Sequence, residues 1–497
     1  MMASRMKARA WALPVLVVAV AVLMRCISFL HDDVSWLLMM AEKTLAGETP
    51  YVDLIDVNPP ASFLIYMPQA ALATLLSIPS TLVVTLSIFA GALASVMLSG
   101  RILLRAALIE DAAASAFATL ALFVLLILCG DVFAQREHVV LIALLPLFSI
   151  YAARLTGAKP DAGSAVAAGI GGGLALALKP YFVLPIALPF LLLLWVRRRR
   201  STEIARAVFA PENLAMAVAS AIYTGAVLVM FPAYIERTIP MALDLYRPIR
   251  LTLAELFKEP ATWALVIAAL IALFFARHRM DKAPVAVCVL AAIGFFLAYF
   301  IQSKGWAYQA FPAIALFLLA SGMACMENFF PAIAGKTPGK KQKRAAFAAL
   351  IAITAADLAV MQLPLFYPPF FARAAALAPA HPKVIAIAET LIGPQMTRLI
   401  GGEWVGRVPN QFMAKNAWDI LHRAPSPDAA TAKRLKAYAA LDRAILAERI
   451  RTQKPDIVLI TEPWLKRWAL SEPTIAAVLR SYREAAVMGR VGIWLRK

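Results

Sequence analysis

The chain has 497 residues, of which 62% are hydrophobic and only 16% are charged. Soluble domains carry about 25% charged residues, so this chain has too little polar surface for an ordinary soluble enzyme, a disordered protein or a disulfide-stapled secreted module. The composition predicts a polytopic α-helical membrane protein. The net charge of +19 is then assigned to loops that orient the chain in a membrane, and no nucleic-acid partner is expected.

The four cysteines lie in or beside apolar segments, and no two of them have CxxC spacing. This pattern predicts small buried hydrophobic residues, not a metal site or a disulfide framework. Cys26 and Cys129 could both lie at the outer surface, so one disulfide between them is an open alternative that nothing else in the sequence supports.

Apolar runs of about bilayer-spanning length recur from residue 11 to residue 363. They predict eleven transmembrane helices, near 11–30, 79–100, 112–130, 139–153, 163–178, 181–196, 213–231, 261–276, 283–301, 309–326 and 345–363. The stretch 61–78 is also apolar, and whether it crosses decides the topology.

Basic loops indicate that 61–78 does not cross. With a cytoplasmic N-terminus and 61–78 at the outer surface as an interfacial or re-entrant helix, every strongly basic short loop lies inside, as the positive-inside rule expects. The basic residues of these inner segments are Arg5, Lys7, Arg9, Arg101, Arg105, Arg154, Lys159, Arg197, Arg198, Arg199, Arg200, Arg277, Arg279, Lys282, Lys336, Lys340, Lys341, Lys343 and Arg344. The chain is therefore predicted to be a multi-pass protein of the inner (plasma) membrane, with its C-terminal region outside.

The composition changes after residue 363. Short β-type runs occur at 384–388, 456–460 and 491–495, and a helical stretch occupies 428–453. We therefore predict two domains: a transmembrane domain over 1–363, and a small extracytoplasmic α/β domain over 364–497.

The first outer loop is rich in acids. Asp32 and Asp33 follow the first predicted span directly, and Asp53 and Asp56 come later in the loop. Two adjacent acids at a membrane surface can take a proton, hold a metal or orient a nucleophile. The alternative is structural, because Asp33 could cap a helix that starts near Ser35.

The other outer loops carry cations where the positive-inside rule expects few. The second loop contains Asp131, Arg136, Glu137 and His138, in which Arg136 and Glu137 form either a local ion pair or part of a phosphate clamp. The later loops add Lys179, Arg247, Arg250 and Lys304, the last followed by Trp306 and Tyr308. Cations on the outer side suggest an anionic ligand at the outer leaflet, and a lipid-linked phosphate is the natural candidate, although Lys179 could also simply snorkel to the interface.

Several of these segments resemble the GT-C glycosyltransferases, a superfamily that includes protein O-mannosyltransferases and aminoarabinose lipid A transferases. The acid pair after the first span, the run AGETPYVDLIDVNPP at 46–60 and the following apolar helix resemble the first outer loop of that superfamily. QREH at 135–138, LKPYF at 178–182 and QSKGWAYQ at 302–309 are similar to its bacterial members. The resemblance covers most of residues 10–320, and its strongest part is 31–60.

The resemblance implies an integral membrane glycosyltransferase, of hexosyl or pentosyl type, that moves a sugar from a polyprenyl-phosphate donor to a lipid, glycan or protein acceptor on the outer face. Asp32 and Asp33 match the catalytic carboxylate, with Asp32 favoured. Many relatives have Asp-Glu at this place, so the Asp-Asp pair leaves open which acid is the base.

The remaining site residues are assigned in the same way. Arg136, Lys179, Arg247, Arg250 and Lys304 are expected to bind the donor phosphate; acceptor or sugar contacts are expected from Asp53, Asp56, Asp131, Glu137, His138, Trp306 and Tyr308. Some members need a divalent cation and others do not. The sequence leaves this open, with Asp32, Asp33, Asp131 and Glu137 as candidate ligands.

Three other classes compete with this interpretation. A transporter or flippase for a lipid-linked or anionic solute would share the charges, but the sequence shows neither inverted repeats nor broken helices. A polysaccharide polymerase or ligase would lack the acid-rich first loop ending in Pro-Pro. A non-catalytic membrane scaffold would use the α/β domain to bind a partner.

Overall fold

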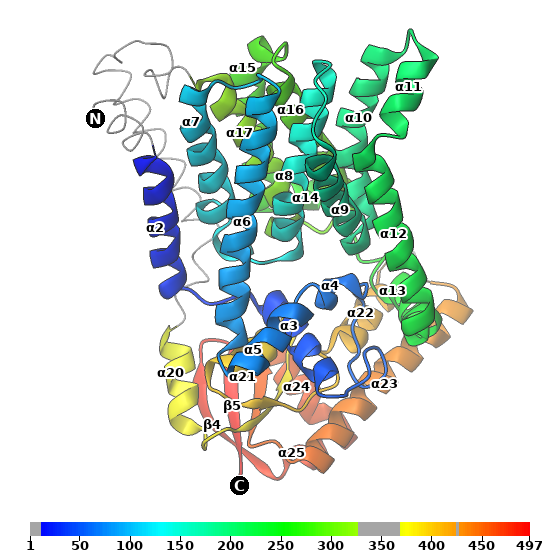
Figure 1. The fold of residues 1–497 in the computed structure, drawn as a ribbon. Coiled ribbons are helices and arrows are strands. Elements are labelled where there is room, and N and C mark those ends of the chain that lie inside the picture. The colour runs from blue at the N-terminus through cyan, green and yellow to red at the C-terminus, as the bar shows by residue number, and fades with distance from the viewer. Residues whose placement is uncertain (1–10, 327–367, 424–426) are drawn as a thin grey trace. The chain divides into compact units, whose positions relative to one another are not determined.

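A computed structural model of the protein describes residues 11–326, 368–423 and 427–497. The chain divides into two compact units, drawn in Figure 1. Among the described residues, unit 1 contains 11–29, 81–225 and 251–326, and unit 2 contains 30–80, 226–250, 368–423 and 427–497. The predicted span at 345–363, the predicted domain boundary at 363/364, and the basic residues 5–9 and 336–344 lie outside the described residues.

Each predicted span that falls within the described residues is helical. These helices are α2 (Ala12–Cys26), α6 (Ser80–Arg105), α7 (Asp111–Leu122) continued by a π-helical turn η1 (Phe123–Ile127), α8 (Arg136–Leu155), α9 (Ala162–Leu178), α10 (Val183–Arg197), α12 (Pro211–Met230), α15 (Pro260–Ala276), α16 (Ala283–Gln302) and α17 (Ala307–Ala324). Short helices η2 (Gly130–Val132), η3 (Pro180–Phe182), α11 (Ser201–Val208), α14 (Leu253–Leu256) and η5 (Arg277–Arg279) connect them.

Within the described ranges, seven helices are long and apolar enough to cross a membrane. Three further predicted spans, α2, α7 with η1, and α9, are apolar but shorter. The four cysteines are free thiols, and all but Cys26 are buried. The predicted multi-pass helical architecture is therefore confirmed, while the number of crossings and their orientation stay predictions.

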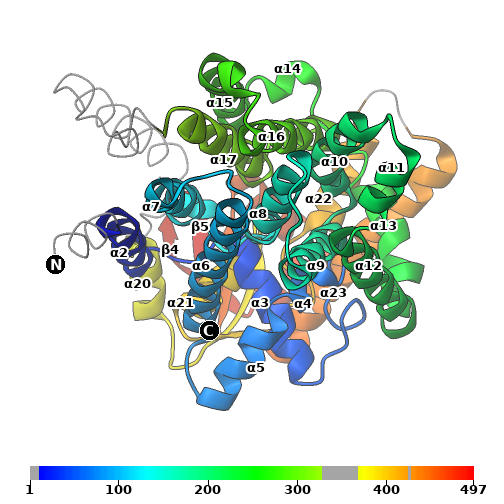
Figure 2. The same ribbon diagram turned by 45° about the horizontal axis from the view of Figure 1, so that its top comes forward.

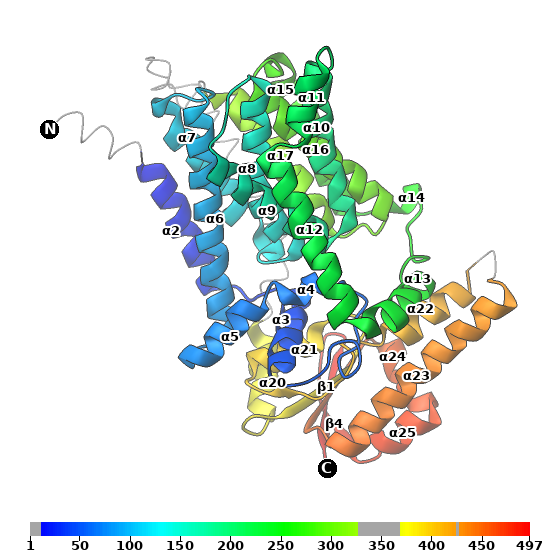
Figure 3. The ribbon, with the colours of Figure 1, turned by 45° about the vertical axis from the view of Figure 1, so that its right-hand side comes forward.

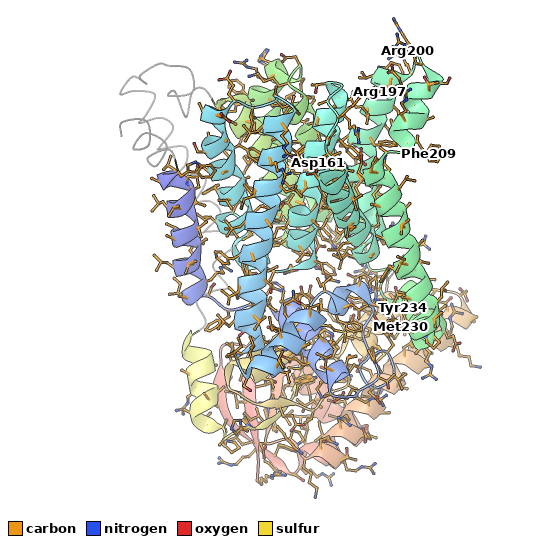
Figure 4. All side chains as sticks on the ribbon, viewed as in Figure 1. Asp161, Arg197, Arg200, Phe209, Met230 and Tyr234 are labelled. Atoms are coloured by element: carbon orange, nitrogen blue, oxygen red, sulfur yellow. The ribbon has the colours of Figure 1, made fainter. Side chains whose placement is uncertain are left out.

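Basic residues from separate loops gather at one end of unit 1. Arg154 makes a two-pronged ion pair with Glu212, with both N–O distances 3.0 Å. Arg197 donates to the carbonyl of Arg154, and Arg105 pairs with Asp161 at 2.9 Å. Figure 4 shows Asp161 and Arg197 toward this same end. Three of the predicted cytoplasmic loops, those with Arg105, Arg154 and Arg197, thus lie together.

Helix α9 lies between α8 and α12 (Figure 2). A Cβ atom on Gly171 would lie 2.4 Å from the carbonyl oxygen of Ala143 in α8, and one on Gly173 would lie 2.6 Å from Ala219 Cβ in α12. Only glycine permits such close approach of helix backbones. The consecutive glycines Gly171, Gly172 and Gly173 therefore form a surface on which α9 packs against its neighbours.

We expect Gly171→Ala to lower the melting temperature of the full-length protein in detergent, because the new methyl group would push α9 away from α8. Overpacking of this kind typically destabilises by about 1–3 kcal/mol. Gly225→Ala is the matched control, since a Cβ there meets nothing within 4 Å. Equal melting temperatures for the two variants would contradict the packing role of Gly171.

The stretch predicted to be interfacial forms two short helices, α4 (Ala61–Leu64) and α5 (Met67–Leu76). They contain four and ten residues, whereas crossing a bilayer takes about 20 helical residues. Leu75 and Leu76 are exposed on α5. Both features are those expected of a helix that lies at a membrane surface.

Unit 2 contains the predicted α/β fold. Its sheet has the order β2-β1-β3-β5-β4, in which β1, β2 and β3 are parallel and β5 is antiparallel to β3 and β4. The strands are β1 (Lys383–Ile387), β2 (Glu403–Trp404), β3 (Ile457–Thr461), β4 (Tyr482–Met488) and β5 (Val491–Arg496). The helices are α3 (Asp32–Leu45), α4, α5, a π-helical turn η4 (Tyr234–Thr238), α13 (Ile239–Leu245), α20 (Pro368–Leu377), α21 (Ile392–Leu399), α22 (Phe412–Leu421), α23 (Ala429–Gln453), α24 (Pro463–Ser471) and α25 (Pro473–Leu479).

The two faces of this sheet are covered by different helices. Ile385 and Ile387 of β1 point into a core shared with α23, α24 and α25. Ala386, which points the opposite way because side chains alternate along a strand, contacts the turn of α21 around Gly393. The sheet therefore lies between α21 on one face and α23 to α25 on the other.

Two other segments of the chain belong to unit 2. Arg407 donates to the carbonyls of Val52 and Asp53, and Arg434 makes a two-pronged ion pair with Asp244 at 2.7 and 3.0 Å. Unit 2 is therefore larger than the predicted domain over 364–497, because hydrogen bonds and ion pairs join the first loop and residues 226–250 to it.

A buried carboxyl group joins α22 and α23. Asp442 is 0% exposed, and its Oδ2 accepts the backbone N–H of Ala414 at 2.9 Å. Burial raises the pKa of Asp442 to about 7, against the opposing effects of the Ala414 and Met413 N–H groups and Arg443. The folded protein therefore binds a proton here that the unfolded chain, with a pKa near 3.8, releases.

Stability contributed by Asp442 is expected to fall as the pH rises from about 4 to 7, since the folded state holds the extra proton in that window. Asp442→Asn keeps an acceptor for the Ala414 N–H but cannot ionise. It should protect the α22 amides from hydrogen exchange more than the wild type does at pH 8, with a smaller difference at pH 5.5. The measurement is exchange mass spectrometry of the full chain, and a pH-independent difference would contradict the assignment.

Candidate active site

One cluster of predicted site residues lies at the end of unit 1 opposite to the basic loops. The Nζ atom of Lys179 pairs with Glu137 Oε1 and lies 5.3 Å from the ring centre of Tyr308. The rings of Tyr308 and Trp306 are 5.5 Å apart, and Lys304 Nζ lies 5.9 Å from the Trp306 ring. Five residues predicted from three separate loops are therefore neighbours.

The helix directions explain why these residues meet. Helix α8 runs from the Arg136–His138 end to Arg154, and α9 returns from Asp161 to Lys179. Glu137 and Arg154 are 17 residues apart on α8, which corresponds to about 26 Å along a helix axis. The Glu137–Lys179 pair and the Arg154–Glu212 pair are therefore separated by most of the thickness of a bilayer's hydrocarbon core. The α16–α17 turn adds the aromatic side chains.

The head of α8 is unusually polar for a buried segment. Arg136, Glu137 and His138 are at most 3% exposed. The N–H of Ala134 donates to His138 Nδ1 at 3.0 Å, so Nε2 carries the proton and donates to Leu125 O at 2.6 Å. Both ring nitrogens of His138 are thus used, and its predicted contact with an acceptor would need one of these bonds to break.

Asp131 and one unpredicted residue complete this region. Asp131 is half-buried in η2. Arg25, in the last turn of α2, donates to Gly130 O at 3.1 Å and stacks over the ring of Phe133 at 4.6 Å. A charged residue inside a predicted transmembrane segment indicates a functional site. Arg25 lies in the predicted span 11–30 and could have been identified on that ground.

The acid pair lies in unit 2, at the first turn of α3. The helix begins at Asp32 and its N-cap is His31, so the alternative in which Asp33 caps a helix starting near Ser35 is wrong. Acids in a first turn are stabilised by the helix dipole. The sequence HDD therefore places both carboxylates at a positive helix end.

The carboxylate of Asp32 is held from two sides. Its Oδ1 lies 2.8 Å from His31 Nδ1 and 2.8 Å from the N–H of Asp33, and its Oδ2 accepts the N–H of Leu391 at 3.3 Å. Burial would raise the pKa of Asp32, but His31 and these two N–H groups outweigh it, so the pKa is lowered. At neutral pH the group is an anion, and its side chain is one quarter exposed, so it can accept a proton, but its lowered pKa makes it a weaker base than a free aspartate.

The later acids of the first loop hold the loop together. Asp53 accepts the N–H of Thr49 at 2.9 Å, and buried Asp56 accepts from the indole of Trp36 and from both the backbone and side chain of Asn58. Their predicted contacts with an acceptor or sugar stay predictions.

The remaining predicted cations lie in a different unit from the first cluster. Arg247 and Arg250 follow α13 in unit 2 and are exposed. In the ranges 11–326, 368–423 and 427–497, no group of three or more His, Cys, Asp or Glu side chains has an arrangement that could hold a metal ion. Metal dependence stays open.

Over nearly its whole length, this chain has a fold similar to that of a solved membrane protein. ArnT from Cupriavidus metallidurans bound to undecaprenyl phosphate aligns over 97% of this chain and 97% of its own, with a TM-score of 0.61 and 13% sequence identity. The apo state of the same protein aligns over 98% of both chains, with a TM-score of 0.59 and 14% identity.

Comparison by sequence adds nothing to this fold match. No family model matches the chain. No curated protein matches it either.

Proposed function

We propose that this protein is an integral membrane glycosyltransferase that moves a sugar from a polyprenyl-phosphate carrier to a lipid, glycan or protein acceptor. The observation that carries the proposal is the Asp32 carboxylate at the head of α3, which accepts the N–H groups of Asp33 and Leu391, in a chain with the fold of ArnT. The undecaprenyl phosphate bound by that relative supports a carrier of the same chemistry.

Asp32 is the proposed general base. The acceptor hydroxyl gives its proton to Asp32 while its oxygen bonds to the anomeric carbon of the sugar. The bond from that carbon to the phosphate oxygen breaks, and the polyprenyl phosphate leaves with the bonding electrons. Asp33 is the second candidate for the base, since both acids lie in the same helical turn.

The cations are proposed to stabilise the departing phosphate, because fixed positive groups act most strongly on charge that develops during the reaction. Lys179 and Lys304 lie next to exposed or half-buried aromatic rings, Trp306 and Tyr308, which can contact the sugar or the prenyl chain. Arg136, Arg247 and Arg250 are the further proposed phosphate ligands. A dependence on a divalent cation is tested by chelation.

The reaction is proposed to occur on the outer face of the inner membrane, with the N-terminus inside. Basic loops gather at the end of unit 1 that is opposite to the Glu137–Lys179 pair, and this supports the orientation. A reporter that is active only in the cytoplasm, fused after Lys497, should be inactive; activity would overturn the orientation.

Lipid extracts from a deletion strain test the function directly. Loss of a glycosyltransferase should cause a sugar-loaded polyprenyl phosphate to accumulate and one glycoconjugate to disappear, which identifies the donor and the acceptor. Purified protein in vesicles should then move the sugar between them. A protein that carries the loaded lipid across the bilayer without transferring the sugar would be a flippase, and the proposal would fail.

A further inference from the structure

One face of α21 is directed at α3 (Figure 3). The residues on this face are Leu391, Gln395 and Arg398, spaced by four and three positions, as residues on one side of a helix are. Leu391 and Arg398 donate hydrogen bonds to residues of α3. Gln395 donates one to Leu30, which precedes the N-cap residue of α3. These contacts extend along α3 from Asp32 in its first turn to Glu42 near its C-terminal end.

The contact is strongest at its far end. The guanidinium of Arg398 makes a two-pronged ion pair with Glu42 at 2.9 and 2.6 Å and donates to Ser35 O at 3.1 Å. Only 13% of the Arg398 side chain is exposed. A shielded two-pronged pair of this kind is geometrically specific, so Arg398 fixes the position of α21 along α3.

The near end of the contact reaches the acid pair itself. Gln395 donates to Leu30 O at 2.8 Å, and the N–H of Leu391 donates to Asp32 Oδ2. All of these donors come from the C-terminal region and all of the acceptors come from the first loop. The carboxylate of Asp32 is thus held by a backbone group about 360 residues away in sequence.

Helix α21 is itself held firmly on the sheet. A Cβ atom on Gly393 would lie 2.6 Å from the Trp404 ring and 2.7 Å from Ala386 Cβ. Glycine therefore lets the helix backbone settle directly on β1 and β2. The sheet, α21 and α3 form successive layers, and the layer nearest to Asp32 cannot shift without disturbing the sheet.

We propose that the C-terminal α/β domain is a working part of the active site, in which α21 orients the Asp32 carboxylate through the Leu391 N–H and the Arg398–Glu42 pair. Leu391 and Arg398 are positioning residues, because they act through Asp32. The inference rests on the proposed role of Asp32 as general base. It gives the C-terminal domain a task in every turnover, whatever the sugar is.

Leu391→Pro removes the N–H donor, and Leu391→Ala removes most of the side chain but keeps the donor. The backbone φ of Leu391 is −86°, which is near the value proline requires. In full-length protein in vesicles, the proline variant should lower kcat about 10-fold below that of the alanine variant, since a misplaced base slows the reaction without loosening substrate. Binding of undecaprenyl phosphate should be the same in both.

Arg398→Met also tests whether α21 orients Asp32, and it leaves the β1–α21 loop unchanged. This variant replaces the proline variant if the latter does not fold. It should lower kcat by a similar factor and leave carrier binding unchanged. Arg434→Met is the matched control, because Arg434 also joins the C-terminal region to an earlier segment by a two-pronged ion pair, with Asp244. That variant should keep wild-type turnover.

A double-mutant cycle separates positioning from general destabilisation. In an Asp32→Asn background, Leu391→Pro and Arg398→Met should cost nothing further, because the group they orient is gone. Additive losses, or no loss of kcat in the single variants, would overturn the inference while leaving the proposed function intact. If Asp32→Asn itself keeps wild-type turnover, the proposed base is wrong instead.

Discussion

Replacing Asp32 by Asn is expected to lower the turnover of sugar transfer by about 10²–10⁴-fold, the range typical for loss of a positioned general base. The amide has nearly the shape of the carboxylate and can still accept the Leu391 N–H, but it cannot take the acceptor's proton. Asp33→Asn should have a smaller effect, because the Leu391 N–H contacts Asp32.

The measurement is a single-turnover assay in vesicles with the sugar-loaded carrier found in the deletion strain. Undecaprenyl phosphate should bind both variants as it binds the wild type, which would show that the transfer step and not carrier binding is affected. Glu48→Gln is the matched control, since Glu48 is an acid of the same loop whose carboxylate pairs with Lys43, at 2.6 Å. If Asp32→Asn and Asp33→Asn both keep full turnover, neither acid is the base.

Local patterns predicted most of the elements. Continuous apolar runs found the described spans, because apolar side chains must face lipid or helix interiors. Runs of β-branched residues found β1, β3 and β5, and the helix predicted at 428–453 is α23. The strands that were missed are β2, with two residues, and β4, whose Arg483 and Glu484 suit an edge strand but hide its β character.

The organisation of unit 2 had no local signal. Arg407 lies in a loop of the C-terminal region and donates to the backbone carbonyls of Val52 and Asp53 in the first loop. Arg398 and Glu42 are 356 residues apart. A single sequence shows that such residues are charged, but it does not show which distant partner each one meets.

Only part of the candidate site could be predicted, because a single sequence does not show which distant residues meet. Loop position and charge found Glu137, Lys179, Lys304, Trp306 and Tyr308, which the structure brings together in unit 1. The backbone N–H of Leu391 could not have been found, since every residue except proline has one. Its importance comes only from where the fold places it.

Removal of the Lys179 side chain is expected to lower both the stability of the protein and its affinity for undecaprenyl phosphate. In Lys179→Met the partner Glu137, whose side chain is 1% exposed, loses its counter-charge. Breaking a buried ion pair on one side typically destabilises by about 3–5 kcal/mol. The variant should therefore melt at a markedly lower temperature than the wild type, and it should also bind undecaprenyl phosphate more weakly.

The double variant Lys179→Met/Glu137→Gln separates these two effects. Without Lys179 the buried charge of Glu137 is the source of the instability, so neutralising it should restore much of the melting temperature. It cannot restore a phosphate ligand, because neither methionine nor glutamine carries a positive charge. Stability that returns together with carrier binding would mean that Lys179 only balances Glu137; stability that returns alone would assign its ammonium group to the carrier phosphate.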